Sequence, residues 1–82
     1  MNEIEREKAD LAKADQDIAE GEVRITRQGE IIEHLRGARH DLAQAEALLD
    51  NLRETLKGWK DHRTQILARI RQLEEEGRGR QP

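Results

Sequence analysis

An apolar residue recurs at every seventh position through the first part of the chain. The residues of this row are Ile4, Leu11, Ile18, Ile25 and Ile32. A seven-residue repeat turns one face of an α-helix toward a partner helix, so we assign this row to position a of a coiled-coil heptad. The d row holds small or polar residues, such as Gly21 and Gln28, until Leu35. The pattern predicts a long helix with a narrow apolar seam.

The second part of the chain carries a stronger pattern, with steps of three and four residues in alternation. Its members are Leu42, Ala45, Leu49, Leu52, Leu56, Trp59, Arg63, Ile66, Ile70 and Leu73. An average period of 3.5 residues is typical of a left-handed supercoil. Leu48 and Leu67 widen the apolar stripe on opposite sides of the seam. A widened stripe indicates more than one packing partner, as in a helical bundle.

Residues with cap preferences mark the ends of both predicted helices. Asn2 is a good N-cap for the first helix. Gly37 is expected to end that helix in the left-handed conformation, which glycine adopts readily. Asp41 is expected to be the N-cap of the second helix, and Gly77 its end. No proline precedes Pro82, so neither helix is interrupted by one.

These signals predict one all-α domain at residues 1–76, followed by a disordered tail at 77–82. The domain would contain helices at 3–36 and 41–76 and a loop at 37–40. A connection this short makes the two helices antiparallel neighbours. The sequence therefore predicts an antiparallel two-helix hairpin of the coiled-coil type.

Folding the chain about residue 39 brings specific positions together. Trp59 falls near Gly21, whose missing side chain could make room for the indole. Arg63, the polar member of the second seam, falls near Asp15 and Asp17. Its aliphatic stem could pack while the guanidinium reaches the surface, or it could fix register or oligomeric state. Residues 1–22 hold eight acids and three bases, and 56–77 hold more bases than acids, which favours this pairing.

The width of the stripes suggests that one hairpin does not cover its own apolar surface. We expect a homodimer in which two hairpins form a four-helix bundle. The alternative is a hairpin that binds a different, unidentified protein. The expected core and dimer seam consists of Ile18, Ile25, Ile32, Leu49, Leu52, Leu56, Trp59 and Ile66.

Composition limits the remaining chemistry. Charged residues make up 40% of the chain, and Trp59 is its only aromatic residue. Cysteine is absent, which excludes disulfides, thiolate catalysis and cysteine metal sites. The acidic N-terminus lacks the features of a signal peptide, and no apolar run could span a membrane. We therefore expect a cytoplasmic protein without membrane association.

No catalytic constellation is recognisable in the sequence. The three histidines, His34, His40 and His62, lie at positions that do not converge within one hairpin, so we expect them to be solvated. A Gly-rich phosphate loop, a nucleophile–base set and metal-ligand spacing are all missing. The expectation is a protein that is not an enzyme and that uses no cofactor or metal.

A group of basic residues near the predicted loop offers a second interpretation. It comprises Arg24, Arg27, Arg36, Arg39 and His40. By analogy with Rop, a plasmid-encoded hairpin that dimerises into a four-helix bundle, this region could bind nucleic acid. The analogy rests on architecture alone. The net charge of −3 and the lack of an aromatic residue among these arginines argue against it.

The sequence also resembles a group of short alphaproteobacterial coiled-coil proteins of unknown function. Residues 14–28 match runs of the type A-D-x-x-I-A-E-G-E-x-R-I-x-R-Q, and 37–49 match G-H-D-T-x-x-A-x-x-L-L. The resemblance covers residues 11–66. The loop is longer than the pattern by two residues, and Leu42 replaces its threonine. The resemblance implies a recurrent surface that includes Gly21, Arg24, Arg27, Gln28, His40 and Asp41.

Together these observations predict a small helical interaction protein. It would self-associate and act through protein contacts as an adaptor, a scaffold or a regulator. The alternative is a Rop-like nucleic-acid binder that uses the basic region near the loop. Arg24, Arg27 and His40 are the first candidates for a contact site because packing explains them least.

Overall fold

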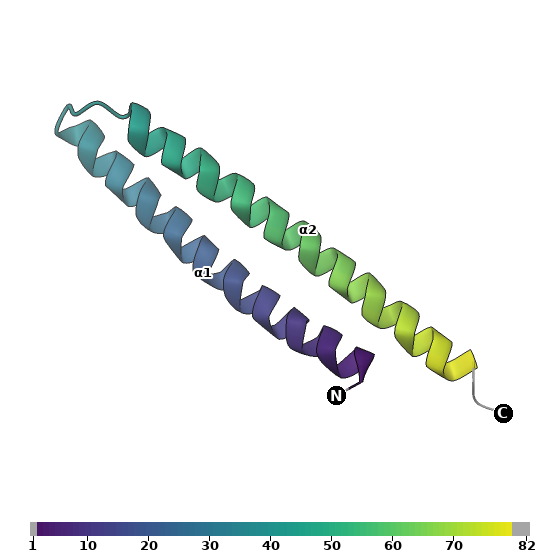
Figure 1. Ribbon diagram of the computed structural model, residues 1–82. Helices are drawn as coiled ribbons and strands as arrows, with labels where there is room; N and C mark the ends of the chain where they lie inside the picture. The colour runs from purple at the N-terminus through teal and green to yellow at the C-terminus, as the bar shows by residue number, and fades with distance from the viewer. Residues whose placement is uncertain (1, 80–82) are drawn as a thin grey trace.

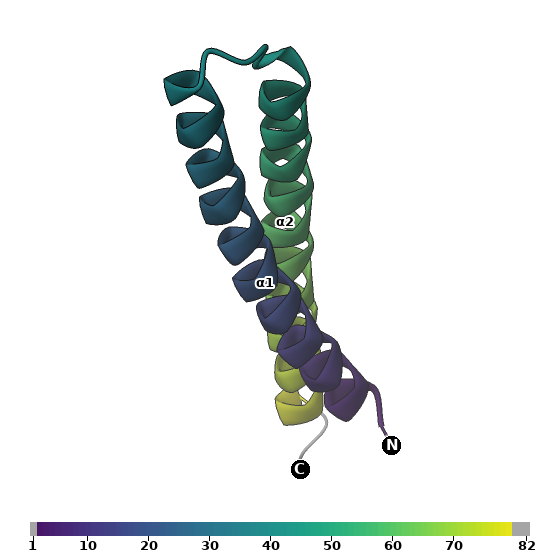
Figure 2. The same ribbon diagram turned by 90° about the vertical axis from the view of Figure 1, so that its left-hand side faces the viewer.

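The computed structural model describes residues 2–79, which form two helices joined by a short loop (Figure 1). α1 spans Glu3–Gly37 and α2 spans Ala43–Gly79. The helices run side by side in opposite directions and are inclined to one another (Figure 2). They form a rod of 70 × 16 × 14 Å. The predicted all-α antiparallel hairpin is confirmed.

The hairpin is described below as two halves. The loop half comprises residues 23–55, and the free half comprises residues 3–22 and 56–79. The start of α1 and the end of α2 lie at the same end of the rod, far from the loop (Figure 1). Within residues 2–79, neither helix has a stretch long and apolar enough to cross a membrane.

α1 begins where the sequence predicts. The Oδ1 atom of Asn2 accepts a hydrogen bond from the backbone N–H of Glu5 at 2.8 Å. This bond satisfies one of the four N–H groups that the first turn leaves without a helical partner. Glu3 and Glu5 place negative charge at the positive end of the helix dipole, which stabilises the same turn.

The end of α1 differs from the prediction. Gly37 is the last helical residue, and no glycine within residues 2–79 has a positive φ. Arg39 takes the left-handed conformation instead, with φ of 62°. The N–H of His40 donates to the carbonyl of Leu35 at 3.0 Å, and that of Arg39 donates to Arg36 at 3.1 Å. These two bonds form a Schellman motif, which fixes the left-handed position two residues beyond Gly37.

The bounds of α2 also correct the predicted 41–76. Asp41 accepts from the N–H of Ala43 at 2.9 Å, and the carbonyl of Leu42 accepts from Glu46 at 2.8 Å. Leu42 therefore occupies the cap position, one residue after the predicted Asp41, and the loop is 38–42.

Gly77 does not end α2, because a glycine permits the left-handed conformation without requiring it. The helix continues to Gly79, and the side chain of Arg78 donates to the backbone carbonyl of Glu74 at 3.4 Å. Residues 77–79 of the expected disordered tail are thus helical. Residues 80–82 lie outside the described range.

The predicted seam lies at the interface between the helices, where each of its members is buried or half-buried. α1 turns its small and polar d row most directly toward α2. Ala14, Gly21 and Gln28 are buried, whereas the larger Ile18 and Ile25 are only half-buried. The Nε2 of Gln28 donates to the backbone carbonyl of Ala45 at 2.8 Å. The buried amide therefore has a partner on the facing helix, which limits the cost of its burial.

The predicted packing of Trp59 on Gly21 is present. A Cβ atom added to Gly21 would lie 3.0 Å from Cζ3 of Trp59 and 3.3 Å from Cδ1 of Leu56. Both distances are shorter than ordinary van der Waals contacts. Gly21 therefore allows the indole to lie directly against the backbone of α1.

In the described part of the chain, three ion pairs connect the helices, each with its acid on α1 and its base on α2. They are Glu22–Lys60 at 3.7 Å, Glu3–Arg69 at 3.4 Å and Asp15–Arg63. Their direction agrees with the charge balance of the sequence. The side chains are 39–64% exposed, so each pair contributes only about 0.2–1 kcal/mol. The Asp15–Arg63 pair brings the one charged seam residue to the surface, as snorkelling predicts.

Candidate interaction surface

All five basic residues predicted to form a contact surface are exposed. Arg24 and Arg27 lie on the loop half of α1, Arg36 lies in its last turn, and Arg39 and His40 lie in the loop. Exposure of these residues is compatible with a contact role. It is equally expected for charged residues on a solvated helix, so their role stays a prediction.

The structure separates these basic residues and places acids among them. Arg27 lines two shallow hollows along α1, and Glu30 lines both. Arg36 pairs with Glu33 on its own helix and lines a different hollow, between the helices. The basic residues thus do not form a continuous stripe of positive charge, which phosphate backbones require.

The histidines are exposed, as the sequence predicts. His62 lines a shallow hollow between the helices together with Asp10 and Asp17, which the sequence did not suggest. Within residues 2–79, no group of three or more histidines and acids is arranged to hold a metal ion. His34 lines the hollow beside Ile31, and His40 stays in the loop.

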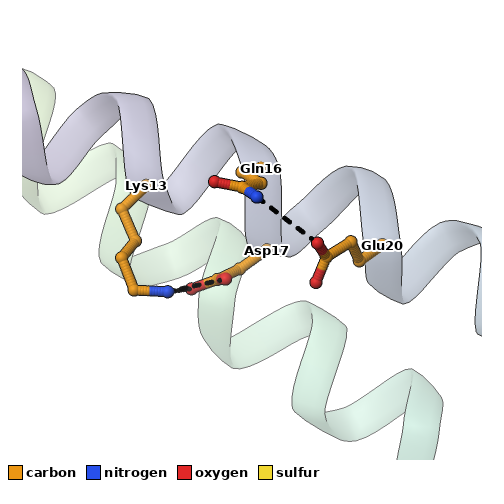
Figure 3. A network of polar contacts seen from close by, with 4 residues as sticks. All are labelled: Lys13, Gln16, Asp17 and Glu20. Atoms are coloured by element: carbon orange, nitrogen blue, oxygen red, sulfur yellow. Dashed lines mark hydrogen bonds and ion pairs between the residues drawn. The ribbon is translucent and has the colours of Figure 1, made fainter.

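Polar contacts between neighbouring side chains of α1 run along the helix (Figure 3). Lys13 donates to both oxygens of Asp17 at 3.1 and 3.4 Å, and Gln16 donates to Glu20 at 3.5 Å. Each pair joins residues four apart, which are neighbours on the helix surface. Such pairs support the helix locally by a few tenths of a kcal/mol. They do not connect α1 to α2.

Among residues 2–79, four large apolar side chains are exposed, and three of them belong to the loop half. Val23, Ile31 and Leu48 are 50%, 49% and 48% exposed, and Leu67 in the free half is 37% exposed. The sequence pattern predicted the outward positions of Leu48 and Leu67, but it did not single out Ile31. The heptads could have identified Ile31 as an outward residue. Ile31 and Leu48 each precede an a residue, and they fall at the same height when the chain is folded.

The loop half has two dissimilar sides. On one side, Ile31 and Leu35 line a mainly apolar hollow on α1. On the other side, the hollow between the helices is bordered by charged residues of both helices, which are Glu33, Arg36, Glu46, Asp50 and Arg53. Only the first side therefore presents apolar surface of the kind that marks protein contacts.

Comparison with protein-family models, curated proteins and solved structures found no match to this chain. The resemblance to short alphaproteobacterial proteins therefore stays a prediction.

Proposed function

We propose that this protein is a small non-enzymatic interaction protein that self-associates through its hairpin and then acts through protein contacts. The observation that carries the proposal is the apolar surface that the hairpin leaves uncovered. Ile31 and Leu48 are about half exposed, and Leu49, Leu52, Leu56 and Trp59 are only half-buried although they belong to the seam.

Incomplete burial is a consequence of having only two helices. Each seam side chain can contact one facing helix, while its flanks remain open to water. Within residues 2–79, no side chain retains less than 2% of its exposure. Covering apolar surface gains about 25 cal/mol per Å², so a second hairpin placed on this seam would stabilise both copies. A four-helix bundle is the usual way in which antiparallel hairpins bury such stripes.

The shape of the rod supports contacts rather than catalysis. A catalytic site normally needs a concave, mainly apolar pocket in which polar groups converge. The hollows described above are shallow, and charged side chains line most of them. A rod of 70 Å offers instead a long surface on which a scaffold or adaptor could hold partners.

Self-association is tested by light scattering on a dilution series, with helicity measured on the same samples by circular dichroism. We expect a mass of twice 9.5 kDa at high concentration, and a loss of helicity as the dimer dissociates. A mass of 9.5 kDa with full helicity at every concentration would overturn the self-association proposal.

The nucleic-acid alternative is tested by titrating labelled RNA hairpins at several salt concentrations. The separated basic residues and the net charge of −3 lead us to expect no binding at physiological salt. Steeply salt-dependent binding that is weakened by Arg24→Ala together with Arg27→Ala would replace the proposal. The matched control is Arg71→Ala together with Arg78→Ala, on the free half of α2.

A further inference from the structure

Two of the three exposed large apolar residues of the loop half, Ile31 and Leu48, fall on one side of the hairpin and at one height. Gly21 with Trp59 and Asp15 with Arg63 show which residues of the two helices lie level with one another. By the same register Ile31 of α1 is level with Leu48 of α2. Both occupy g positions, which flank the same side of an antiparallel pair. We call Ile31, Leu35 and Leu48 the loop-half patch, because Leu35 shares the hollow beside Ile31.

The same side becomes charged toward the free ends. Asp10 and Asp17 of α1 line one hollow with His62 of α2, which shows that these three residues share a side. Arg69 follows His62 by one heptad and pairs with Glu3. At Asp10, Asp17, His62 and Arg69 the side thus carries acids on α1 and basic groups on α2, and at Ile31 and Leu48 it carries apolar residues on both helices.

We propose that this side is the dimer contact, and that its occupant is the same side of a second copy with both loops at the same end. The proposal deepens the self-association proposed above and rests on it. A two-fold axis along the rod places α1 of each copy against α2 of the other copy. Residues that are level within one hairpin then also face one another between the copies.

Complementarity between residues at equal heights favours this orientation. Ile31 of one copy faces Leu48 of the other, so each patch covers the other and leaves water. Asp17 faces His62 of the second copy, and Asp10 faces Arg69. Three levels of this side thus pair apolar with apolar or acid with base, whereas Arg24 faces the neutral Thr55 and Glu3 faces Glu76 at the free end.

The opposite orientation, with the loops at opposite ends, lacks this match. Reversing the second copy about the middle of the rod places Ile31 against Asp10 and Leu48 against Arg69. Each half-exposed apolar side chain would then force a charged group out of water without a partner, which is costly. Asp17 would gain Arg24 as a partner, but exposed charge pairs contribute little. The loop-half patch therefore selects the orientation with both loops together.

Orientation is measured with spin labels, because the chain contains no cysteine and single labels can be introduced cleanly. The variants are His40→Cys in the loop and Glu75→Cys near the free end, both at exposed positions. Two rods of 16 × 14 Å side by side predict distances between the copies below about 35 Å for both labels.

Other dimers give different pairs of distances. Loops at opposite ends would place both pairs of labels roughly 50 Å apart, which is the length of one helix. In a third arrangement, the two copies touch only through their loop halves and extend in opposite directions. The labels at position 40 would then be close together, and those at position 75 would be on the order of 100 Å apart. Either pattern would overturn the orientation while leaving self-association intact. A monomeric mass would overturn both proposals.

The side is tested by substitution, with dimer dissociation followed by light scattering. Ile31→Glu and, independently, Leu48→Glu should each weaken the dimer by about tenfold or more, because each buries a charge against the patch of the second copy. Val23→Glu is the matched control, since Val23 is equally exposed but lies away from this side. It should change dissociation less than about twofold. Circular dichroism verifies that each variant stays helical. Equal effects of all three substitutions would overturn the assignment of this side.

Discussion

In the free half of the hairpin, Ile66, Ile70 and Leu73 retain only 4–8% of their exposure, whereas Ile31 and Leu48 in the loop half retain 49% and 48%. The free half also contains the cluster of Ala14, Ile66 and Ile70 and the three interhelical ion pairs described above. The loop half has Ile32 and the hydrogen-bonded Gln28 as its buried members.

The difference follows from how each end is held together. In the loop half, the short connection keeps the helices close at little entropic cost. In the free half no connection exists, so packing alone prevents the helix ends from separating. The loop half can therefore leave apolar side chains outside its own core. Under the proposed function, the free half supplies stability and the loop half supplies the interaction surface.

Truncating a buried residue of the free half and an exposed residue of the loop half gives the largest expected contrast. Ile66→Ala should lower the free energy of unfolding by about 2–4 kcal/mol, because it removes buried methyl groups and leaves a cavity. Val23→Ala on the exposed loop half should change it by less than about 0.5 kcal/mol. Urea unfolding followed by circular dichroism, at one protein concentration for both variants, measures the difference. Equal losses would contradict the division into a stabilising and a contact half.

Matched glycine substitutions test the contact between Trp59 and Gly21. Gly29→Ala should raise the free energy of unfolding by up to about 1 kcal/mol, because nothing lies within 4 Å of the new Cβ. Gly21→Ala forces Trp59 to move, and overpacking of this kind costs about 1–3 kcal/mol. We expect the two variants to differ by that amount, and only Gly21→Ala to shift the tryptophan fluorescence. Two equally stable variants would mean that the indole does not pack on α1.

The loop itself offers the smallest predicted effect. Arg39→Gly should raise the free energy of unfolding by about 0.5–1 kcal/mol, because a left-handed non-glycine residue is strained. Ala38→Gly is the control: Ala38 has φ of −89°, so glycine there should only cost stability. Thermal unfolding of both variants gives the comparison. If Arg39→Gly were as destabilising as Ala38→Gly, the Schellman motif centred on Arg39 would be wrong.

Most of the fold could be predicted from the heptad rows. The rows at Ile4–Ile32 and Leu42–Leu73 predict both helices, and the position of the turn predicts their register. That register places Trp59 on Gly21 and Arg63 beside Asp15, as found. The loop was predicted less well. Gly37 is a strong local signal for a helix end, but the hydrogen bonds that close α1 place the left-handed residue at Arg39.

The candidate surface was predicted only in part. The basic residues near the loop were predicted from the sequence to form a contact surface. The structure separates Arg27 from Arg36 and pairs Arg36 with Glu33. Ile31 was missed because it looks like a neighbour of the a residue Ile32. Its position beside the seam follows from the heptads, but how far it is exposed depends on the rotation of α1 about its own axis.

The sequence by itself determined the two helices, their antiparallel pairing and the residues of the seam, because a seven-residue period specifies which face of each helix is apolar. The tertiary structure decided which residues of that face point most directly at the other helix. It brings Ala14, Gly21 and Gln28 closest to α2 and leaves Ile18 and Ile25 half-buried. The physical reason is that helices approach most closely where side chains are small, and this rotation depends on packing between the helices rather than on the period within either one.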